Sequence, residues 1–582
     1  KKLQNIALMC QTCPTKLYCP YNSSYLFTYA ATNEPQIIVN GQEFTERLIC
    51  HKCPYGGVCI AGQLTPFPGF WGVWSADGVR FYQRPSGYCC TGEADAPCDS
   101  YHACAANRDG VLCGSCEPGF SLALLSPSCM KNDECDESWI WSISVLIIIM
   151  YTAFYTLNGV IMDLFKSMLQ FIAKKLMAFK EAKVHYAIPS NSINSCYFGI
   201  LANFVQCTSL LQTDLNLKQA QGTSAMSLLE VIFQSIFSLD TPDISFDVCP
   251  VQCLSFSLKL LLKIVRVTSL FICWGLCYSC LIAIEKFHHN IFGLKDIFVL
   301  GLFDIFKYTY SAFASSTFTA LTCITISDQS VWKYDGNVSC FTFWQYCYLV
   351  FALLNTIPFT LIFWFGVKCL KFNLISKEEF ILSFIIPLPF LVHWIFLLHS
   401  VNQKRQINLS KTCFAGANVN LSPDVTHDNS LNGNQVEGRR EVGLVKEIIN
   451  MLQNPYKEHK SAMYWESVIE IRRLALCLLQ FIHFDYLRMI LSAIACLIFL
   501  AHHIGVYPYK SNSANRSEMF SVMLLLVVTV FNFMKCLMQE IKTFSEEMLQ
   551  LLKILNVIEV FMPIVLMLFM AICSVFSTAS RP

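Results

Sequence analysis

Charged side chains fall within stretches of this chain that are otherwise apolar enough to cross a membrane. Lys259, Lys263 and Arg266 are spaced so that they share one face of a helix. An ionisable group inside a bilayer is costly and marks a functional candidate, so this face must contact protein or water. Glu230 and Glu559, which we expect in the same outer half of the bilayer, are the predicted partners of this stripe.

Three interpretations of this outer stripe remain open. The charges could form a salt-bridge network that locks the spans together, line a path for ions or anions, or sense voltage. Voltage sensors use longer and more regular arginine repeats than this one. Lys259 alone could also extend its charged end to the membrane interface.

A second set of charges is predicted in the inner half of the bilayer. Asp304 and Lys307 are three residues apart, so they are expected to pair within one helix. Glu470, Arg472 and Arg473 are expected near the cytoplasmic interface.

Cysteines are the other residues with distinctive chemistry. The chain has 30 cysteines, and three of them with a proline repeat the same spacing forty residues apart, which indicates two copies of one small unit. A region with few core-forming side chains ahead of a spanning helix predicts disulfides, whose pairing the sequence does not give, although CxxC pairs can also bind zinc. The cysteines predicted to form disulfides are Cys10, Cys13, Cys19, Cys50, Cys53, Cys59, Cys89, Cys90, Cys98, Cys104, Cys113, Cys116, Cys129, Cys135, Cys249, Cys253, Cys323 and Cys340.

Two features of the predicted outer loops can be placed more closely. Cys323 and Cys340 bound one short loop, so we predict a disulfide between them. The sequons at Asn22 and Asn337 are predicted to carry N-glycans. Those at Asn408, Asn420 and Asn515 are predicted to lie on the cytoplasmic side and to be unused.

Motifs of enzyme chemistry are absent from the sequence. It contains no HExxH, GxSxG, P-loop or GxGxxG. His502 and His503 are adjacent and would point in different directions on a helix, so we expect no metal site there. Cys273, Cys277 and Cys280 share one helix face and are expected to be buried free thiols, rather than a cluster or a palmitoylation site. We therefore expect a protein that is not an enzyme and has no cofactor beyond bound lipids and N-glycans.

The elements that must position these residues are membrane spans. Of the 582 residues, 54% are hydrophobic, which is too many for an ordinary soluble protein. The net charge of +1 and the lack of a separate basic domain argue against a nucleic-acid partner. Ser138–Met162 is long enough to cross the bilayer, and Trp139 and Trp141 suit its interface.

The predicted topology follows from the positions of the lysines. Lysines crowd the loop after the first span, so that loop is cytoplasmic and the N-terminus is outside. The chain opens with neither Met nor an apolar leader, so we expect a signal peptide and further ectodomain upstream. About nine spans then place the C-terminus in the cytoplasm: Ser138–Met162, Ile193–Gln212, Ser257–Ile284, Ile297–Ile324, Phe343–Val367, Glu466–Phe481, Leu487–Val506, Glu518–Met538 and Leu551–Phe576.

Two further apolar segments are not predicted to cross the membrane. Residues 224–239 are too short and are expected to form an extracellular half-helix. Residues 380–398 contain Pro387 and Pro389 at their centre and have lysines on both sides, which favours a re-entrant hairpin over a kinked span.

The predicted fold is a small disulfide-rich ectodomain joined to an all-α polytopic membrane bundle. Residues 1–137 form the ectodomain, and residues 138–399 contain five spans, the half-helix and the hairpin. Residues 400–463 are a polar cytoplasmic linker with an amphipathic helix at 442–454, and residues 464–582 contain four further spans and a short tail.

Parts of the sequence resemble known families. The repeated cysteine units are similar to ephrin-receptor-like and TNF-receptor-like modules, and GVLCGSCEPGFS at 110–121 is similar to laminin EGF-like repeats. Such modules usually bind proteins or act as stalks. Tyr464-Trp-Glu466-x3-Glu470-x-Arg472-Arg473 and Pro508-Tyr-Lys510-x4-Asn515-x2-Glu518 each lead into a span. With the half-helix and the cysteine-bounded loops, they resemble the polytopic domain of large cysteine-rich surface proteins of protists and invertebrates, which is similar to TRP-like channels.

The resemblance implies a cell-surface protein of the plasma or ciliary membrane, in which the ectodomain passes force or ligand binding to a channel domain. No selectivity-filter sequence is recognisable. The alternatives are a receptor or anchor that does not conduct and holds extracellular filaments or matrix, and a lipid or solute transporter. Expected partners are membrane lipids and an extracellular protein or the upstream ectodomain, with oligomerisation left open.

Overall fold

The computed structural model describes most of the chain after residue 50. The described residues are 17–18, 27–28, 36–39, 42–44, 51–60, 63–67, 69–75, 78–84, 87–89, 100–156, 191–211, 247–285, 292–414, 448–449, 452, 455–457, 462, 464–482, 484–540 and 546–579. Cys10, Cys13, Cys19, Cys50, Cys90, Cys98, Asn22, the 224–239 segment with Glu230, and most of the 400–463 linker lie outside them.

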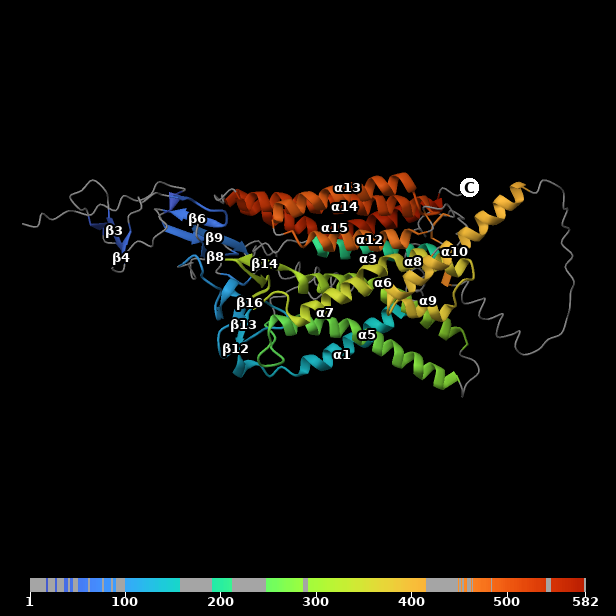
Figure 1. The fold of residues 1–582 in the computed structure, drawn as a ribbon, viewed down its shortest axis with the longest axis horizontal. Helices are drawn as coiled ribbons and strands as arrows, with labels where there is room; N and C mark the ends of the chain where they lie inside the picture. The colour runs from blue at the N-terminus through green and yellow to red at the C-terminus, as the bar shows by residue number, and fades with distance from the viewer. Residues whose placement is uncertain are drawn as a thin grey trace, which may run out of the picture.

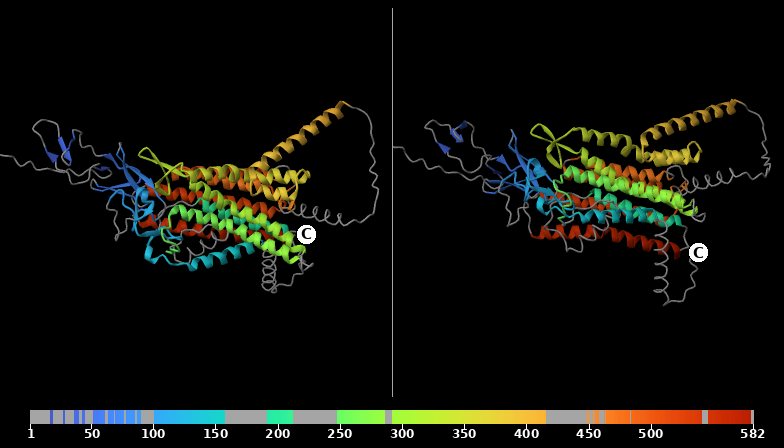
Figure 2. Two further views of the ribbon diagram at one scale, coloured as in Figure 1. Left: turned by 60° about the horizontal axis from the view of Figure 1, so that its bottom comes forward. Right: turned by 90° about the horizontal axis from the view of Figure 1, so that it is seen from below.

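Long helices run side by side along the longest axis of the molecule (Figure 1). The cysteine-rich region, residues 51–137, covers one end of this bundle, called the outer end below, and the C-terminus lies at the opposite, distal end (Figures 1 and 2). In the described part of the chain, six helical stretches are long and apolar enough to cross a membrane, so the chain is a membrane protein in contact with lipid. They are Trp139–Thr156, Phe256–Ile284, Phe343–Lys371, Asp485–Val506, Asn512–Met538 and Ile554–Cys573.

These stretches belong to helices whose bounds differ slightly. They are α1 (Trp139–Thr156), α5 (Phe256–Glu285), α7 (Phe343–Phe351) with the π-helical turn η4 (Ala352–Thr356) and α8 (Ile357–Lys371), α13 (Asp485–Val506), α14 (Asn512–Glu540) and α15 (Glu546–Ala579). Pro358 lies just after η4, so the irregular turn falls where a proline interrupts the hydrogen bonds of the continuous helix.

Three more predicted spans form helices that are not among the six. They are α3 (Asn191–Leu211), whose apolar part is Cys196–Leu211, α6 (Phe292–Leu321) and α12 (Trp465–Leu479). These three helices carry buried polar side chains and pack against each other and against α14 and α8. The described residues therefore support six of the nine predicted spans by length and composition.

The segment predicted as a re-entrant hairpin forms two helices that fold back on each other. α9 (Lys377–Ser383) begins where Ser376 Oγ accepts a hydrogen bond from Glu379 N, and α10 (Pro387–Phe414) begins at Pro387. Trp394 Nε1 donates to Glu379 Oε1 at 2.9 Å, which joins the two arms. Pro387 thus starts a helix instead of breaking one, and α10 continues as far as Phe414, through residues that were predicted to be a linker.

Small antiparallel sheets build the cysteine-rich region. The chain forms β6 (Gly57–Ile60) paired with β7 (Gln63–Pro66), β8 (Phe70–Ser75) with β9 (Gly78–Gln83), β10 (Arg108–Asp109) with β11 (Ser115–Cys116) and β12 (Phe120–Leu122) with β13 (Cys129–Lys131). Two 3-10 turns, η1 (Val111–Cys113) and η2 (Asn132–Glu134), lie among them. The preceding strands are β1 (Leu17–Tyr18), β2 (Phe27–Thr28), β3 (Gln36–Val39), β4 (Gln42–Phe44) and β5 (His51–Lys52).

Among the described residues, five disulfides crosslink this region and the outer loops. They are Cys53–Cys59, Cys104–Cys113, Cys116–Cys129, Cys135–Cys249 and Cys323–Cys340. The Cys323–Cys340 pairing is the predicted one, and the crosslinks indicate an extracellular cysteine-rich region. The prediction was wrong for Cys89 and Cys253, which have free thiols. Cys104 and Cys249, which neighbour them in the chain or in space, bond to Cys113 and Cys135.

The cysteine-rich region packs directly onto the outer loops of the bundle. The loop after α6 forms a three-stranded sheet of β14 (Cys323–Ile326), β15 (Gln329–Trp332) and β16 (Asp335–Ser339). Asn337 in β16 accepts a hydrogen bond from Val111 N and donates one to Ser115 Oγ. Asn337 Nδ2, the atom that would carry the sugar, is the one that donates to Ser115 Oγ. Glycosylation of Asn337 stays a prediction.

Candidate functional site

One face of α12 supplies the charges of a buried network. Glu466, Glu470 and Arg473 are spaced at i, i+4 and i+7, so they share this face. Glu470 is 0% exposed and Arg473 is 2% exposed. Charges this deeply buried require partners of opposite charge or hydrogen bonds, and α6 and α3 supply them.

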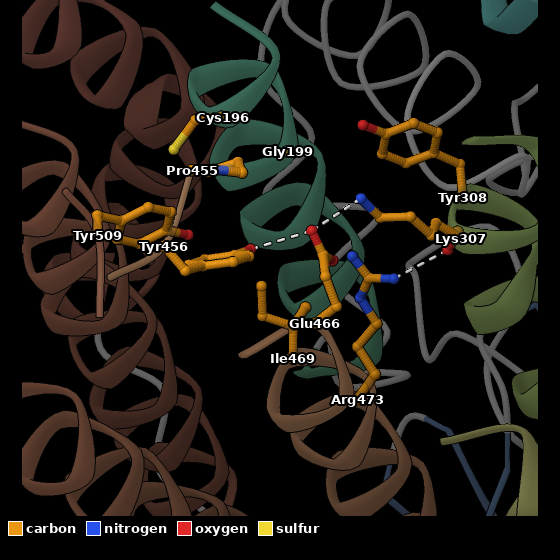
Figure 3. Close-up of a pocket in the computed structure, with 10 residues that line it drawn as sticks. All are labelled: Cys196, Gly199, Lys307, Tyr308, Pro455, Tyr456, Glu466, Ile469, Arg473 and Tyr509. Atoms are coloured by element: carbon orange, nitrogen blue, oxygen red, sulfur yellow. Dashed lines mark hydrogen bonds and ion pairs between the residues drawn. The ribbon is translucent and has the colours of Figure 1, made fainter. Parts of the chain in front are cut away.

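Glu466 is held between a cation and a hydroxyl group. Lys307 Nζ, near the middle of α6, lies 3.1 Å from Glu466 Oε1. The hydroxyl of Tyr456 donates to the same oxygen at 3.0 Å (Figure 3). Burial, and next the charge of Glu466, raise the pKa of the Tyr456 hydroxyl well above its usual value, so it stays a proton donor.

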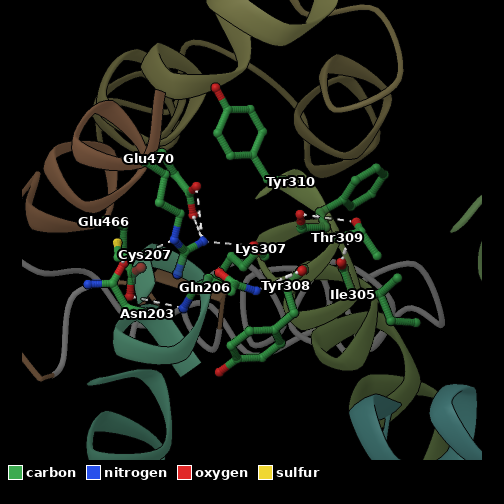
Figure 4. A network of polar contacts seen from close by, with 12 residues as sticks. Asn203, Gln206, Cys207, Ile305, Lys307, Tyr308, Thr309, Tyr310, Glu466 and Glu470 are labelled. Atoms are coloured by element: carbon green, nitrogen blue, oxygen red, sulfur yellow. Dashed lines mark hydrogen bonds and ion pairs between the residues drawn. The ribbon is translucent and has the colours of Figure 1, made fainter. Parts of the chain in front are cut away.

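Arg473 joins three helices through its guanidinium group. Its Nη1 donates to both carboxylate oxygens of Glu470, at 2.9 and 3.1 Å, and to the backbone oxygen of Lys307 at 2.9 Å. Its Nε donates to Asn203 Oδ1 on α3 at 3.0 Å. Gln206, one helical turn further along α3, donates to the backbone oxygen of Tyr308 on α6 at 2.9 Å (Figure 4). The charges are therefore compensated across α3, α6 and α12.

A small cavity of about 30 Å³ lies beside these groups. Lys307, Glu466 and Arg473 line it together with Tyr456 and Tyr509 (Figure 3). A polar cavity of this size has room for about two water molecules. It is too small for a hydrated ion, so the helices would have to move apart before an ion could pass here.

A second branch of charges links α12 to α13 and α14. Arg472 Nη1 lies 2.6 Å from Glu518 Oε1, and both side chains are almost fully buried. Trp465 Nε1 donates to both oxygens of Glu518 at 3.2 Å, and the Arg472 guanidinium lies 4.7 Å from the centre of the Trp465 ring. His503 Nδ1 on α13 is 3.6 Å from Glu518 Oε1.

The loops that precede α12 and α14 pair with each other at the distal end. Lys457 N donates to Pro508 O at 2.8 Å, and Lys510 N donates to Pro455 O at 2.9 Å. Asn515 holds the second loop, because its side chain accepts from Tyr509 N and donates to the backbone oxygens of Tyr509 and Ser511. The two sequence motifs recognised before these helices therefore meet in one structure.

The predicted outer stripe does not form the ion pair expected of it with Glu559. That carboxylate accepts from Lys535 Nζ on α14 at 2.6 Å, while Lys259 Nζ donates to Ser126 O in the cysteine-rich region at 3.3 Å. Lys263 and Arg266 are half-buried on α5. The cause is that α14 and α15 pack together on their own side, while α5 packs against α1 and α6.

The inner charges include a partner that was not predicted. Lys307 pairs with Glu466 from another helix, and the charge of Asp304, its predicted partner in the same helix, also acts on it. Sequence reasoning missed Asn203, Lys535 and the role of Tyr456. A polar residue at helical spacing within an apolar stretch was the available signal for the first two. Nothing in the sequence indicated that Tyr456 would fold back onto α12.

The chemistry of this site is electrostatic. Within the described ranges no group of three His, Cys, Asp or Glu side chains could hold a metal ion. Opposite charges and hydrogen bonds hold α3, α6 and α12 in one arrangement, and separating these helices would expose the charges. Comparison with protein-family models, with curated proteins and with solved structures finds no match to this chain.

Proposed function

We propose that this chain is a multi-pass cell-surface membrane protein whose bundle is a TRP-like ion channel, closed in this structure. In this proposal the cysteine-rich region faces the exterior and the C-terminus faces the cytoplasm. The observation that carries the proposal is the charged network of Lys307, Glu466, Glu470 and Arg473 around a polar cavity inside the bundle. A protein that only anchors an ectodomain has no need for buried charges in its bundle, because they are costly in lipid.

The closed state is attributed to pairing of the charges. Each acidic group of the network accepts from a cation, so an ion entering the cavity would have to replace these contacts. We propose that force or ligand binding at the cysteine-rich region separates the helices and lets water replace the ion pairs. The proposal assigns no catalytic reaction and no cofactor to the chain.

The route from the cysteine-rich region to the bundle follows its contacts. The Cys135–Cys249 disulfide joins the residues just before α1 to the loop before α5. Glu137 Oε2 accepts from Cys249 N at 2.9 Å, and the backbone of Leu122 donates to Leu254 O at 3.0 Å. A displacement of the cysteine-rich region would therefore act on α1 and α5 together.

A second candidate function is a membrane anchor or receptor that does not conduct. The crosslinked outer surface favours it, because the same contacts would transmit load into the bilayer without any opening of the bundle. Under this candidate the buried ion pairs only lock the helices together.

Ion flux through purified protein in liposomes distinguishes the two candidates. The full chain is reconstituted, and flux of potassium and chloride is measured while osmotic tension and voltage are varied. A channel passes ions above the level of empty liposomes, and Lys307→Met changes the flux while Lys377→Ala, a variant outside the network, does not. Correctly inserted, folded protein that passes neither ion under any of these conditions would refute the channel and favour the anchor.

A further inference from the structure

Three thiols on α5 point away from the bundle. Cys277 and Cys280 are exposed and Cys273 is partly exposed, and their spacing of four and three residues places them on one helical face. The sequence predicted buried thiols that act as small packing groups, and the exposure of Cys277 and Cys280 contradicts this. The second half of α5 extends beyond α1 toward the distal end (Figure 1), and among the described residues Cys277 and Cys280 remain exposed there.

The position of these thiols along α5 can be estimated from the outer end. Lys259 contacts the cysteine-rich region there, through Ser126 O. A helix crosses the hydrocarbon layer in about twenty residues, so α5 reaches the distal interface near Ser279. Cys280 then lies at that interface, Cys277 within about 5 Å of it, and Cys273 about two turns deeper than Cys280.

Neighbouring aromatic residues also indicate that this part of α5 lies near the distal membrane interface. Trp274 and Tyr278 stack with their ring centres 5.1 Å apart, and Trp274 Nε1 donates to Phe298 O on α6 at 2.9 Å. Trp and Tyr are enriched at membrane interfaces, where their rings contact lipid and their polar atoms find partners. Lys286 follows soon after in the sequence. The two outermost thiols are thus within reach of both the lipid and the aqueous side.

We propose that Cys277 and Cys280 are sites of S-acylation by a long-chain fatty acyl thioester, such as an acyl-coenzyme A. The cysteine sulfur attacks the thioester carbonyl carbon, a new carbon–sulfur bond forms, and the bond from that carbon to the coenzyme A sulfur breaks. Coenzyme A leaves as a thiol and takes the proton that the cysteine lost. No oxidant or reductant is required, and juxtamembrane cysteines are the usual sites of this modification.

The attached chain has an apolar surface to follow. Leu276, one helical turn before Cys280, is 64% exposed, and Ile272, a turn earlier, is also 64% exposed. The methylene groups of an acyl chain are stabilised by burial in the lipid, so the chain would hold the distal end of α5 at the interface. This inference does not depend on whether the bundle conducts.

Acyl exchange on the full-length protein expressed in cells tests the proposal. Free thiols are blocked with N-ethylmaleimide, thioesters are cleaved with neutral hydroxylamine, and the released thiols are tagged with a polymer-linked maleimide. We expect two hydroxylamine-dependent mass shifts in the wild type and neither in Cys277→Ser/Cys280→Ser. Cys347→Ser is the matched control, because Cys347 is also exposed but lies on α7 near the outer end; it should keep both shifts.

Two outcomes would overturn the assignment. The first is a wild-type protein without hydroxylamine-dependent shifts whose Cys277 and Cys280 react with N-ethylmaleimide. The second is a double variant that keeps both shifts, since the acyl chains would then be on other cysteines. Cys277→Ala/Cys280→Ala is measured in parallel, and gel filtration of each variant establishes that a lost shift does not come from misfolding.

Discussion

At the scale of single residues, the described ion pairs differ in burial. The side chains of Arg472 and Glu518 are 4% and 2% exposed, whereas those of Lys377 and Glu378 are 22% and 67% exposed. Removing one member of a buried pair leaves an uncompensated charge, while a pair that water reaches contributes little because water can solvate the group that remains. Mutation of the two pairs should therefore have very different effects.

Arg472→Ala should lower the free energy of unfolding by about 3–5 kcal/mol, because Glu518 is left charged and buried. Lys377→Ala should change it by less than about 1 kcal/mol. Thermal unfolding of the purified variants in detergent measures both effects. The double variant Arg472→Met/Glu518→Leu removes both charges, so it should be much more stable than Arg472→Ala. Equal losses of stability in Arg472→Ala and Lys377→Ala would contradict this account of the pairs.

The two free thiols near the outer end should differ in reactivity. Burial raises the pKa of the Cys89 thiol to about 12, whereas Cys253 is exposed. Since the thiolate is the nucleophile, we expect iodoacetamide at pH 8.5 to alkylate Cys253 and to spare Cys89 until the protein unfolds. Peptide mass spectrometry measures the alkylation of each cysteine. Equal alkylation of Cys89 and Cys253 in folded protein would contradict the burial of Cys89.

The raised pKa of Cys89 also predicts how the stability of the protein changes with pH. A protonated Cys89 in the folded state binds its proton more tightly than in the unfolded chain, where the thiol pKa is about 8.5. Its contribution to stability is therefore complete below about pH 8.5 and is lost as the pH rises toward about 12.

At the scale of elements, close packing of α8 against the α9–α10 hairpin depends on one glycine. A Cβ atom at Gly366 would lie 2.4 Å from the ring of Phe380 and 2.6 Å from that of Trp394. Both rings are fully buried, so neither can move aside cheaply. Gly275 on α5 is the matched site, because a Cβ atom there meets nothing within 4 Å.

Gly366→Ala should destabilise the protein by about 1–3 kcal/mol, the usual cost of overpacking a filled core. Gly275→Ala should be neutral or stabilise it by up to about 1 kcal/mol, because alanine favours a helix. Thermal melts of the two variants in the same detergent compare them. A loss for Gly275→Ala as large as that for Gly366→Ala would show that the packing of the hairpin is not the cause.

Apolar length made some elements predictable and left others uncertain. The six stretches that meet the length and composition criteria all correspond to predicted spans, because long apolar runs have few alternatives. The continuation of α10 to Phe414 was missed because those residues are polar and show no apolar periodicity. Pro387 was read as a helix breaker, although proline is equally suited to a helix start.

At the scale of the whole molecule, disulfides determine how the outer end is connected. Cys135–Cys249 closes a loop with a sequence separation of 114, whereas Cys53–Cys59 spans a separation of only 6. A crosslink restricts the unfolded chain more when it closes a longer loop. The long-range crosslink is also the one that joins the cysteine-rich region to the loop before α5.

Cys135→Ser/Cys249→Ser should therefore cost more stability than Cys53→Ser/Cys59→Ser. The loop-entropy relation gives about 4–5 kcal/mol for the first and about 2 kcal/mol for the second. Unfolding under non-reducing conditions, followed by intrinsic fluorescence, measures the order of the two losses. The reverse order would mean that the contacts of Leu122 and Glu137 already fix the outer end without the crosslink.

Partners between distant segments were the part of the site that the sequence could not supply. The sequence motif contained Glu466, Glu470, Arg472 and Arg473. Lys307, the partner of Glu466, lies 159 positions earlier in the chain. Helix spacing defines which residues share a face, and it does not define which helices become neighbours. Glu559, a predicted partner of the outer stripe, accepts from Lys535 on α14 for the same reason.

The most direct test of the central claim, that ions pass beside the buried charge network, is the reversal potential of unitary currents in planar bilayers under a potassium chloride gradient. If the network lines the path, Glu466→Gln should shift the reversal potential toward that of chloride, because a negative charge is lost. Lys307→Met should shift it the opposite way, toward that of potassium. Currents whose reversal potential is the same in both variants and in the wild type would contradict the account.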